Sequence, residues 1–290
     1  MATLQTKIDF AVIFQVKNAN PNGDPLNGNR PRTDYDGYGE VADVCIRRKL
    51  RDRLQEQGYS IFVQSDDRRT DDYKSLKSRA EGVLGANLGS DVKTVARACE
   101  QWFDVRAFGQ IFAYSGSGKK AKGKKSEDAD AQTENGAGVS IPIRGPVSVQ
   151  TAISVAPVNV SSMQISKSVS GEGDGTKRGS DTMGMKHRVE KSAIYVFYGA
   201  INPQLAEKTN FSEEDAEAIK KTLPKMFEND ASSARPEGSM QILKVFWWKH
   251  NSKAGQFSSA KVHNSLKVNS DGTFELENLD GLKPEIIDGF

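Results

Sequence analysis

Hydrophobic and polar residues alternate along residues 7–17, and this period of two is typical of a β-strand with one buried face. A loop rich in Asn, Gly and Pro follows from Asn18. Beyond Val41 the hydrophobic period changes to four, which predicts an amphipathic helix that ends near Gln57, since Gly58 stops it. The apolar positions that define the strand and the helix are Ile8, Phe10, Val12, Phe14, Val16, Ile46, Leu50 and Leu54.

The same criteria predict further elements along the chain. Residues 66–103 form an amphipathic helical segment, and a helix over residues 212–227 has Ser212 as N-cap and Asp215 at the capping-box position. A strand–helix–strand pattern occurs at residues 7–63 and again at 191–250. This is compatible with an α+β fold on a ferredoxin-like, RRM-like sheet. The other strands are expected at residues 59–63, 104–112, 141–155, 193–201 and 240–250.

Large aromatic side chains beside the expected strands have two possible roles, which are core packing and stacking on nucleobases. We expect core packing for Trp102, Phe103 and Phe108, because aromatic residues next to strands mostly fill interiors. The same holds for Trp247 and Trp248. Strand alternation places these two tryptophans on opposite faces of one sheet.

The composition is that of a globular protein, with 290 residues, 37% hydrophobic and 27% charged. No run of about 18 apolar residues predicts a membrane span. Cys45 and Cys99 fit neither a disulfide framework nor a zinc site. We therefore expect a cytoplasmic protein without metal or cofactor. The net charge of +2 does not itself predict nucleic-acid binding, but basic residues concentrate in residues 30–53, 119–125 and 177–191.

The loop and helix after the first strand carry the best candidates for a phosphate-binding site. An Asn- and Gly-rich loop can turn backbone N–H groups toward an anion, and arginines can meet phosphates. Arg47 and Arg51 lie on one border of the buried helix stripe. The alternative is a solvated helix face, which is the usual position of a charge run. The candidates are Asn20, Asn22, Gly23, Arg30, Arg32, Arg47, Arg48 and Arg51.

Two later segments have few apolar residues over much of their length. Residues 115–138 have almost no apolar content, which predicts a flexible surface loop whose lysines are either solvated or in contact with nucleic acid. Residues 156–190 combine an alternating stretch with a Gly- and Ser-rich one. In their last part, Lys186, His187 and Arg188 are candidates for phosphate or sugar contact. A lone His187 has no partner pattern for catalysis.

At several of these places the sequence resembles a known family. The opening loop and helix are similar to the backbone subunit of the subtype I-C (Dvulg) CRISPR Cascade complex, which belongs to the Cas-seven family of the RAMP superfamily. The later strings follow in the family's order, so the resemblance covers most of the chain. The similar runs are Asn20-Pro-Asn-Gly-Asp, Gly28-Asn-Arg-Pro-Arg-Thr-Asp, Val41-x-Asp-Val-Cys-x-x-Arg-Lys-x-Arg, Asp104-Val-Arg-Ala-Phe-Gly, Ile143-Arg-Gly-Pro-Val, Gly184-Met-Lys-His-Arg-Val and the strand from Ala193 to Asn202.

The resemblance implies a division of the chain into a core sheet (palm), a helical insertion (fingers) and a hairpin-like arm (thumb). Met163 or Met183 is then a candidate apolar wedge near the tip of the arm, and Met163 and Arg144 join the RNA-binding candidates. The implied parts are residues 1–65 of the core, 66–103 as the helical insertion, 104–155 with the flexible loop 115–138, 156–190 as the arm, and 191–290 as the rest of the core and a C-terminal segment.

The function that the resemblance implies is non-catalytic. The protein would bind CRISPR RNA through its phosphates, associate with further copies of itself along the guide, and present the guide for pairing with target DNA in antiviral defence. Its other partners would be the large subunit and the guide 5′-end-binding subunit of Cascade. Two alternatives remain open: a general single-stranded RNA-binding protein, or a RAMP-type endoribonuclease that uses Asp24, Asp34 and Asp36. Aspartates beside Gly and Pro are also common turn formers.

Overall fold

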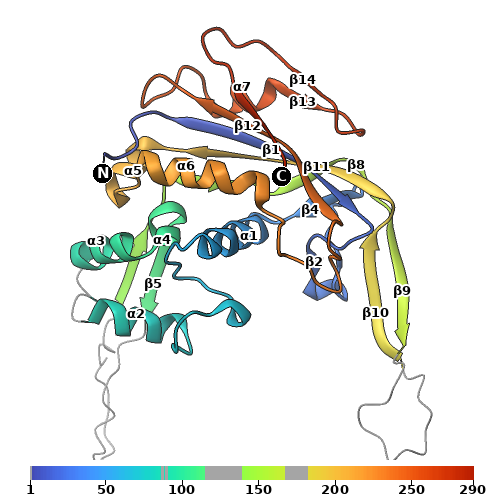
Figure 1. Cartoon of the computed structure of the whole chain (residues 1–290), viewed down its shortest axis with the longest axis horizontal. Coiled ribbons are helices and arrows are strands. Elements are labelled where there is room, and N and C mark those ends of the chain that lie inside the picture. The colour runs from blue at the N-terminus through green and yellow to red at the C-terminus, as the bar shows by residue number, and fades with distance from the viewer. Residues whose placement is uncertain (1, 86–87, 89–90, 115–138, 167–181) are drawn as a thin grey trace, which may run out of the picture.

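The computed structural model describes residues 2–85, 88, 91–114, 139–166 and 182–290, and its framework is a seven-stranded sheet (Figure 1). The order is β15-β12-β1-β11-β8-β4, with β7 also paired to β11, and neighbouring strands run antiparallel. An α+β protein with an antiparallel main sheet is thereby confirmed. The strands are β1 (Ile8–Lys17), β4 (Tyr38–Val41), β7 (Val147–Val149), β8 (Ala152–Pro157), β11 (Ser192–Ile201), β12 (Met240–Lys249) and β15 (Glu285–Asp288).

The remaining elements cover the two faces of this sheet or extend from it (Figure 1). The helices are α1 (Asp43–Glu56), α2 (Leu76–Leu84), α3 (Asp91–Gln101), α4 (Phe103–Phe108), α5 (Pro203–Thr209), α6 (Glu213–Thr222) and α7 (Ser259–Asn264), with short 3₁₀ turns η1 (Pro25–Asn27), η2 (Asp66–Arg68) and η4 (Leu223–Lys225). The shorter strands are β2 (Gly23–Asp24), β3 (Arg30–Pro31), β5 (Gln110–Tyr114), β6 (Val139–Ile143), β9 (Val160–Ser166), β10 (Thr182–Val189), β13 (Leu266–Val268) and β14 (Phe274–Leu276).

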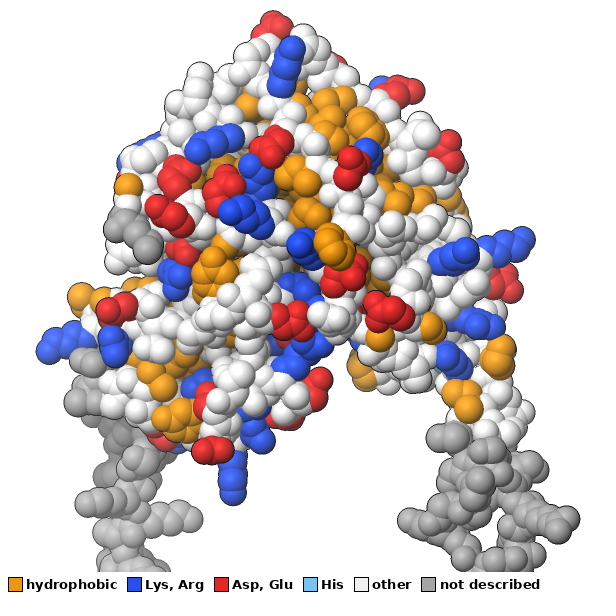
Figure 2. Space-filling view, in the orientation of Figure 1, with side chains coloured by type: hydrophobic (Ala, Val, Ile, Leu, Met, Phe, Trp, Pro, Cys, Tyr) orange, Lys and Arg blue, Asp and Glu red, His pale blue; other side chains and the backbone are white. Residues whose placement is uncertain are grey.

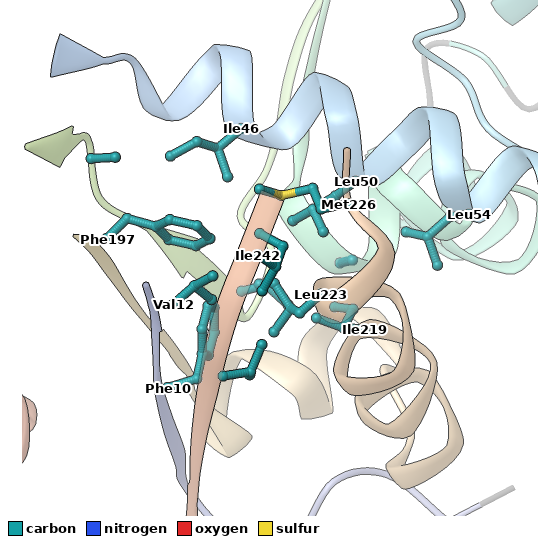
Figure 3. Packing of buried hydrophobic residues seen from close by; sticks show 14 of the residues in the cluster. Phe10, Val12, Ile46, Leu50, Leu54, Phe197, Ile219, Leu223, Met226 and Ile242 are labelled. Atoms are coloured by element: carbon teal, nitrogen blue, oxygen red, sulfur yellow. The ribbon is translucent and has the colours of Figure 1, made fainter. Parts of the chain in front are cut away.

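The main core lies between the sheet and the helices α1 and α6 (Figure 3). The stripe of α1 is confirmed, because Ile46, Leu50 and Leu54 are all buried. Each fully buried side chain of this size stabilises the fold by about 1.5–3 kcal/mol. Opposite them, Figure 3 shows side chains from β1, β11, β12 and the α6 region, namely Phe10, Val12, Phe197, Ile219, Leu223, Met226 and Ile242.

Strand β1 is buried on both faces, whereas its alternation predicts one buried face. Ala11 and Ile13 belong to a second apolar cluster on the other side of the sheet. The cover on that side comes from α7, β13 and β14, which lie far along the chain. Trp247 packs in the main core and Trp248 in the second cluster, so the prediction of one tryptophan on each face is confirmed.

A separate lobe holds α2, α3, α4 and the β5–β6 pair around its own apolar cluster (Figure 1). Helices within residues 66–103 are therefore confirmed, and Trp102, Phe103 and Phe108 are buried as expected. Two strand predictions here are wrong. Residues 59–63 have no strand pairing, because the amides of Phe62 and Val63 bond to the Asp104 carboxylate instead.

The second wrong strand prediction concerns residues 104–112, which begin as helix α4 and become strand only from Gln110. Asp104 lies in the first helical turn, and Gly109 ends the helix with a φ of 80°. The strand–helix–strand unit predicted at residues 7–63 is also wrong. The next strands of the main sheet after α1 are the distant β7 and β8. Both pair with β11, β7 at residues 199–201 and β8 at residues 195–196.

Strands β9 and β10 form a two-stranded antiparallel hairpin that leaves the main sheet at β8 and β11 (Figure 1). It occupies the interval for which an arm is expected. Residues 167–181 of that interval, and the lysine-rich segment 115–138, lie outside the described residues. None of the helices in the described ranges is long and apolar enough to cross a bilayer.

Candidate nucleic-acid interface

The loop between β1 and α1 is held by its own asparagines. Asn18 adopts a left-handed conformation, with φ 50°, and exchanges two 3.0 Å hydrogen bonds with Lys191 at the root of the hairpin. The Asn20 side chain is buried and donates to the Asn29 carbonyl at 2.7 Å. Asn22 Oδ1 accepts from the Ala42 amide at 2.9 Å, directly before α1. These amides therefore shape the loop, which fixes the direction of its backbone groups.

The short β2–β3 ladder inside this loop presents two arginines. Gly23 pairs with Pro31, and a Cβ at Gly23 would lie 2.7 Å from Asn29 Cγ, so glycine allows the close approach. Arg32 is 38% exposed, and its only ion pair within the described residues is a 3.5 Å contact with Asp24. Arg30 has no carboxylate partner among the residues that the structure describes. Both guanidinium groups are thus available to an anion.

The basic residues of α1 are all paired with carboxylates, unlike the open basic row that the sequence suggests. Arg47 pairs with Asp43, and Arg48 pairs with Asp52 at 3.2 Å. Both arginine side chains remain 27% exposed at the surface. Lys49 and Arg53 are buried, and their partners are Asp230 and Glu56.

Arg51 forms an ion pair with a fully buried carboxylate. Its Nε donates to Asp104 at 2.9 Å, and the side chains of Arg51 and Asp104 are 12% and 1% exposed. Burial lowers the pKa of Arg51, while the Asp104 charge opposes this shift. Asp104 also accepts the Phe62 and Val63 amides at 2.7 and 3.1 Å. The position favours a structural role for Arg51, in tying α1 to the helical lobe.

The hairpin has two chemically different faces. Cross-strand partners share a face, and successive residues alternate between faces. The partners Met163–Lys186 and Ser161–Arg188 therefore place an exposed apolar side chain beside two cations. His187 lies on the other face, where its Nδ1 contacts the Ser162 hydroxyl at 2.8 Å. The sequence candidates of the hairpin are thus divided between its faces.

The loop and the hairpin are neighbours although they are distant in the sequence. The Val189 amide donates to the Ala19 carbonyl at 2.8 Å, and β10 and β3 have Cα atoms within 8 Å of each other. Figure 2 shows Lys and Arg side chains along the hairpin and below α1, on either side of a hollow between the hairpin and the helical lobe. Tertiary structure therefore brings the two candidate segments to one surface.

Three aspartates were candidates for cleavage chemistry. Asp24 Oδ1 accepts the Leu26 amide at 3.2 Å, and Asp34 Oδ1 accepts the Asp36 and Tyr38 amides at 3.0 and 2.8 Å. These are the hydrogen bonds of aspartates that form turns. Asp36 is exposed within the second turn. Arg144 is also exposed, in the link between β6 and β7.

Sequence reasoning missed the acidic residues that hold several of the arginines in place. Asp104 and Asp215 lie in helices far from the loop in sequence, yet Asp104 holds Arg51, and Asp215 holds Arg106 through two bonds of 2.9 and 2.7 Å. It also missed Asp230 and Arg235. These residues are revealed by contacts between segments distant in the sequence. The only local sequence signal among them was the capping position of Asp215.

Comparisons with known proteins give matches over nearly the whole chain. The sequence profile described as CRISPR-associated protein Cas7 matches residues 6–283. A Haloferax volcanii protein named CRISPR-associated protein Cas7 is 29% identical over 294 residues, which are 99% of this chain and 82% of that protein. A chain of a "CRISPR RNA-guided surveillance complex, pre-nicking" has a TM-score of 0.45 and 13% identity, over 84% of this chain and 78% of that one. A chain of a "CRISPR RNA-guided surveillance complex" has a TM-score of 0.43 and 15% identity, over 92% and 78%.

Proposed function

The chain belongs to the CRISPR-associated protein Cas7 family, and from this premise we propose that it is a non-catalytic, CRISPR RNA-binding backbone subunit of a type I-C Cascade complex. Several copies would associate along the guide spacer in the prokaryotic cytoplasm. Together they would hold the guide for pairing with target DNA. The large subunit and the guide 5′-end-binding subunit would complete the complex.

The observation that carries this proposal is the shared surface of the β1–α1 loop and the β9–β10 hairpin. Arg30 and Arg32 are available at the loop, and Lys186 and Arg188 lie on one face of the hairpin. A guide has an arbitrary sequence, so its carrier must gain affinity from phosphates and not from base edges. Exposed or weakly paired cations on two adjacent segments suit this task.

The topology supports the assignment of a palm, fingers and thumb. The path β1, α1, β8, β11, α6, β12 combined with the order β12-β1-β11-β8 supports a βαββαβ ferredoxin-like sheet, which would be the palm. The lobe of α2, α3 and α4 would be the fingers, and the hairpin would be the thumb. Met163, 49% exposed, would then meet bases on the apolar part of the thumb.

The engagement of Asp24 and Asp34 in turns supports a binding function over an endoribonuclease. A repeated contact between different patches of one protein gives an open helical assembly when its rotation does not close. Self-association along the guide therefore separates this proposal from a general single-stranded RNA-binding protein. That protein would bind RNA without regular spacing of copies.

The test measures mass and stoichiometry by light scattering, with and without a CRISPR RNA, at two salt concentrations. We expect salt-sensitive assembly of several copies on the RNA. The Arg30→Ala/Arg32→Ala variant should bind more than about tenfold more weakly, with a salt slope smaller by about two. Arg47→Ala/Arg48→Ala is the matched control, because each of these side chains has a closer carboxylate partner than the one 3.5 Å from Arg32. A wild-type protein that stays monomeric with RNA would overturn the proposal.

A further inference from the structure

A second loop, residues 229–239, lies along the β1–α1 loop on the side away from the hairpin. The Asn20 amide donates to the Ala234 carbonyl at 2.9 Å, and the Lys17 amide to Ser239 at 2.7 Å. The Ala19 carbonyl, in the same peptide unit as the Asn20 amide, instead accepts from Val189 of the hairpin. The C=O and N–H of a trans peptide point in opposite directions. The β1–α1 loop is therefore flanked by the hairpin on one side and by residues 229–239 on the other.

This second loop adds charge to the surface. Asp230 pairs with Lys49 of α1 and accepts a 3.1 Å hydrogen bond from Arg235 Nε. Burial raises the pKa of Cys45, as does the Asp230 charge, and the charges of Lys49, Arg235 and Arg32 oppose this shift. Loop 229–239 thus contributes the Asp230–Arg235 pair to the charged groups around Cys45.

Arg235 differs from Arg47 and Arg48, which contact their carboxylates through an Nη atom, and from Arg51, whose side chain is only 12% exposed. Its side chain is 25% exposed, and only Nε is bonded to the carboxylate. Neither Nη atom has a hydrogen bond to the residues that the structure describes. The outer edge of a guanidinium can donate two parallel hydrogen bonds to a phosphate. Asp230 orients the group through its inner nitrogen and leaves that edge available.

We propose that Arg235 contacts a phosphate of the guide RNA and that Asp230 is its positioning residue. This inference rests on the proposed function and extends its site to the far side of the β1–α1 loop. The guide would then contact cations of three segments: the hairpin, the β1–α1 loop and residues 229–239. Asp230 would have two opposed effects, since it orients Arg235 and also weakens the local positive potential.

The two partners of this ion pair provide the test. Arg235→Ala removes the cation, whereas Asp230→Asn keeps the cation and an oxygen acceptor for its Nε, so a direct phosphate contact predicts opposite effects for the two variants. We expect R235A to weaken binding of a fluorescein-labelled single-stranded RNA about tenfold at about 100 mM salt and to reduce the salt slope by about one. D230N should bind as tightly as wild type or more tightly, because the Asn oxygen can still accept a hydrogen bond from Arg235 Nε while one negative charge is removed. Equal weakening in both variants would overturn the proposal.

Asp230 also pairs with buried Lys49, so thermal melting is measured first for each variant. If D230N does not fold, the contrast is made between Arg235→Lys, expected to keep the salt slope, and Arg235→Gln, expected to lose about one unit of it. Arg97→Ala is the control, because Arg97 is 46% exposed on α3, where it pairs with Glu100. RNA binding that is weakened by Arg32→Ala but unchanged in R235A would refute the role of Arg235 alone. No binding by the wild type would refute the proposed function itself.

Discussion

Gly109 and Gly145 cross with their backbones in direct contact. A Cβ at Gly145 would lie 2.5 Å from the Gly109 amide nitrogen, and a Cβ at Gly109 would lie 2.7 Å from that of Gly145. The crossing joins the end of α4 to the link between β6 and β7. It explains two short strings of the sequence, Asp104 to Gly109 and Ile143 to Val147, as the two sides of one backbone contact.

Gly145→Ala should lower the free energy of unfolding by about 3 kcal/mol, because the new methyl group meets backbone atoms that cannot move aside. Urea unfolding measures this change. The control is Gly58→Ala, since Gly58 has φ 89° and open space around it. That variant should cost only about 1 kcal/mol, from backbone strain. Equal effects of the two substitutions would contradict the crossing.

Arg51→Met should destabilise the fold by about 3–5 kcal/mol, because it leaves the buried Asp104 carboxylate without its cation. Arg32→Met at the exposed loop should change stability by no more than about 0.5 kcal/mol. Chemical denaturation provides both values. If R51M is as stable as wild type and binds RNA more weakly, Arg51 contacts RNA and is not a structural residue.

The two faces of the hairpin should differ in RNA binding. Lys186→Ala/Arg188→Ala removes both cations of one face, and we expect the salt slope to fall by about two. Met185→Ala/His187→Ala changes the other face of the same strand and is the matched control. Fluorescence anisotropy over a salt series measures both. A larger loss in the control variant would place the RNA on the His187 face.

Stability should fall as the pH drops below neutral, through His263. Burial lowers the pKa of His263 below its ordinary value of 6.5, against the Asp9 charge and the Gly199 carbonyl. The unfolded chain therefore binds this proton at a higher pH than the folded chain does. The stabilisation is complete above pH 6.5 and is lost as the pH falls from there toward the lowered pKa.

The check for His263 is urea unfolding at several pH values between about 5 and 8. His263→Gln should have a shallower pH dependence than wild type in the range below 6.5. The charged and titratable groups around this site are Lys7, Asp9, His250 and Tyr198. His187→Gln, on the hairpin surface, is the control. An H263Q profile parallel to that of wild type would contradict the prediction.

Asp34→Ala should lower stability by about 1 kcal/mol, because its carboxylate accepts two backbone amides of the turn. RNA incubated with magnesium ions should remain intact with both wild type and variant. The control is Asp36→Ala, whose carboxylate accepts no hydrogen bond from the described residues. Metal-dependent cleavage that is lost in D34A would instead support the endoribonuclease alternative.

Much of the fold could be predicted locally, because period and capping are local properties. The stripe Ile46, Leu50, Leu54 and the Ser212–Asp215 capping box are found where the sequence indicates them. Residues 59–63 and 104–112 could not be predicted in this way. Their apolar alternation resembles that of a strand. Asp104, however, accepts hydrogen bonds from the amides of Phe62 and Val63, and it lies in the first turn of helix α4.

The candidate site shows the same division. Sequence reasoning selected Arg30 and Arg32, whose only ion pair within the described residues is the 3.5 Å contact of Arg32, together with Arg47, Arg48 and Arg51, which have closer carboxylate partners. The sequence could not distinguish the two sets, because a helical pattern gives the direction of a side chain but not the groups that the side chain contacts. Arg235 was missed for the same reason, since it lies far along the chain from the loop it adjoins.

The sequence by itself determined the α+β class, the central strand, the amphipathic α1 and the basic segments. Each of these follows from patterns among residues that are close together in the sequence. Only the tertiary structure decided which charges are free. The free-energy cost of diverting an arginine to a phosphate depends on its carboxylate partner and on its exposure to solvent. Both are set by contacts between distant segments. Arg51 and Arg235 show this dependence, with Asp104 and Asp230 as the partners that fix their roles.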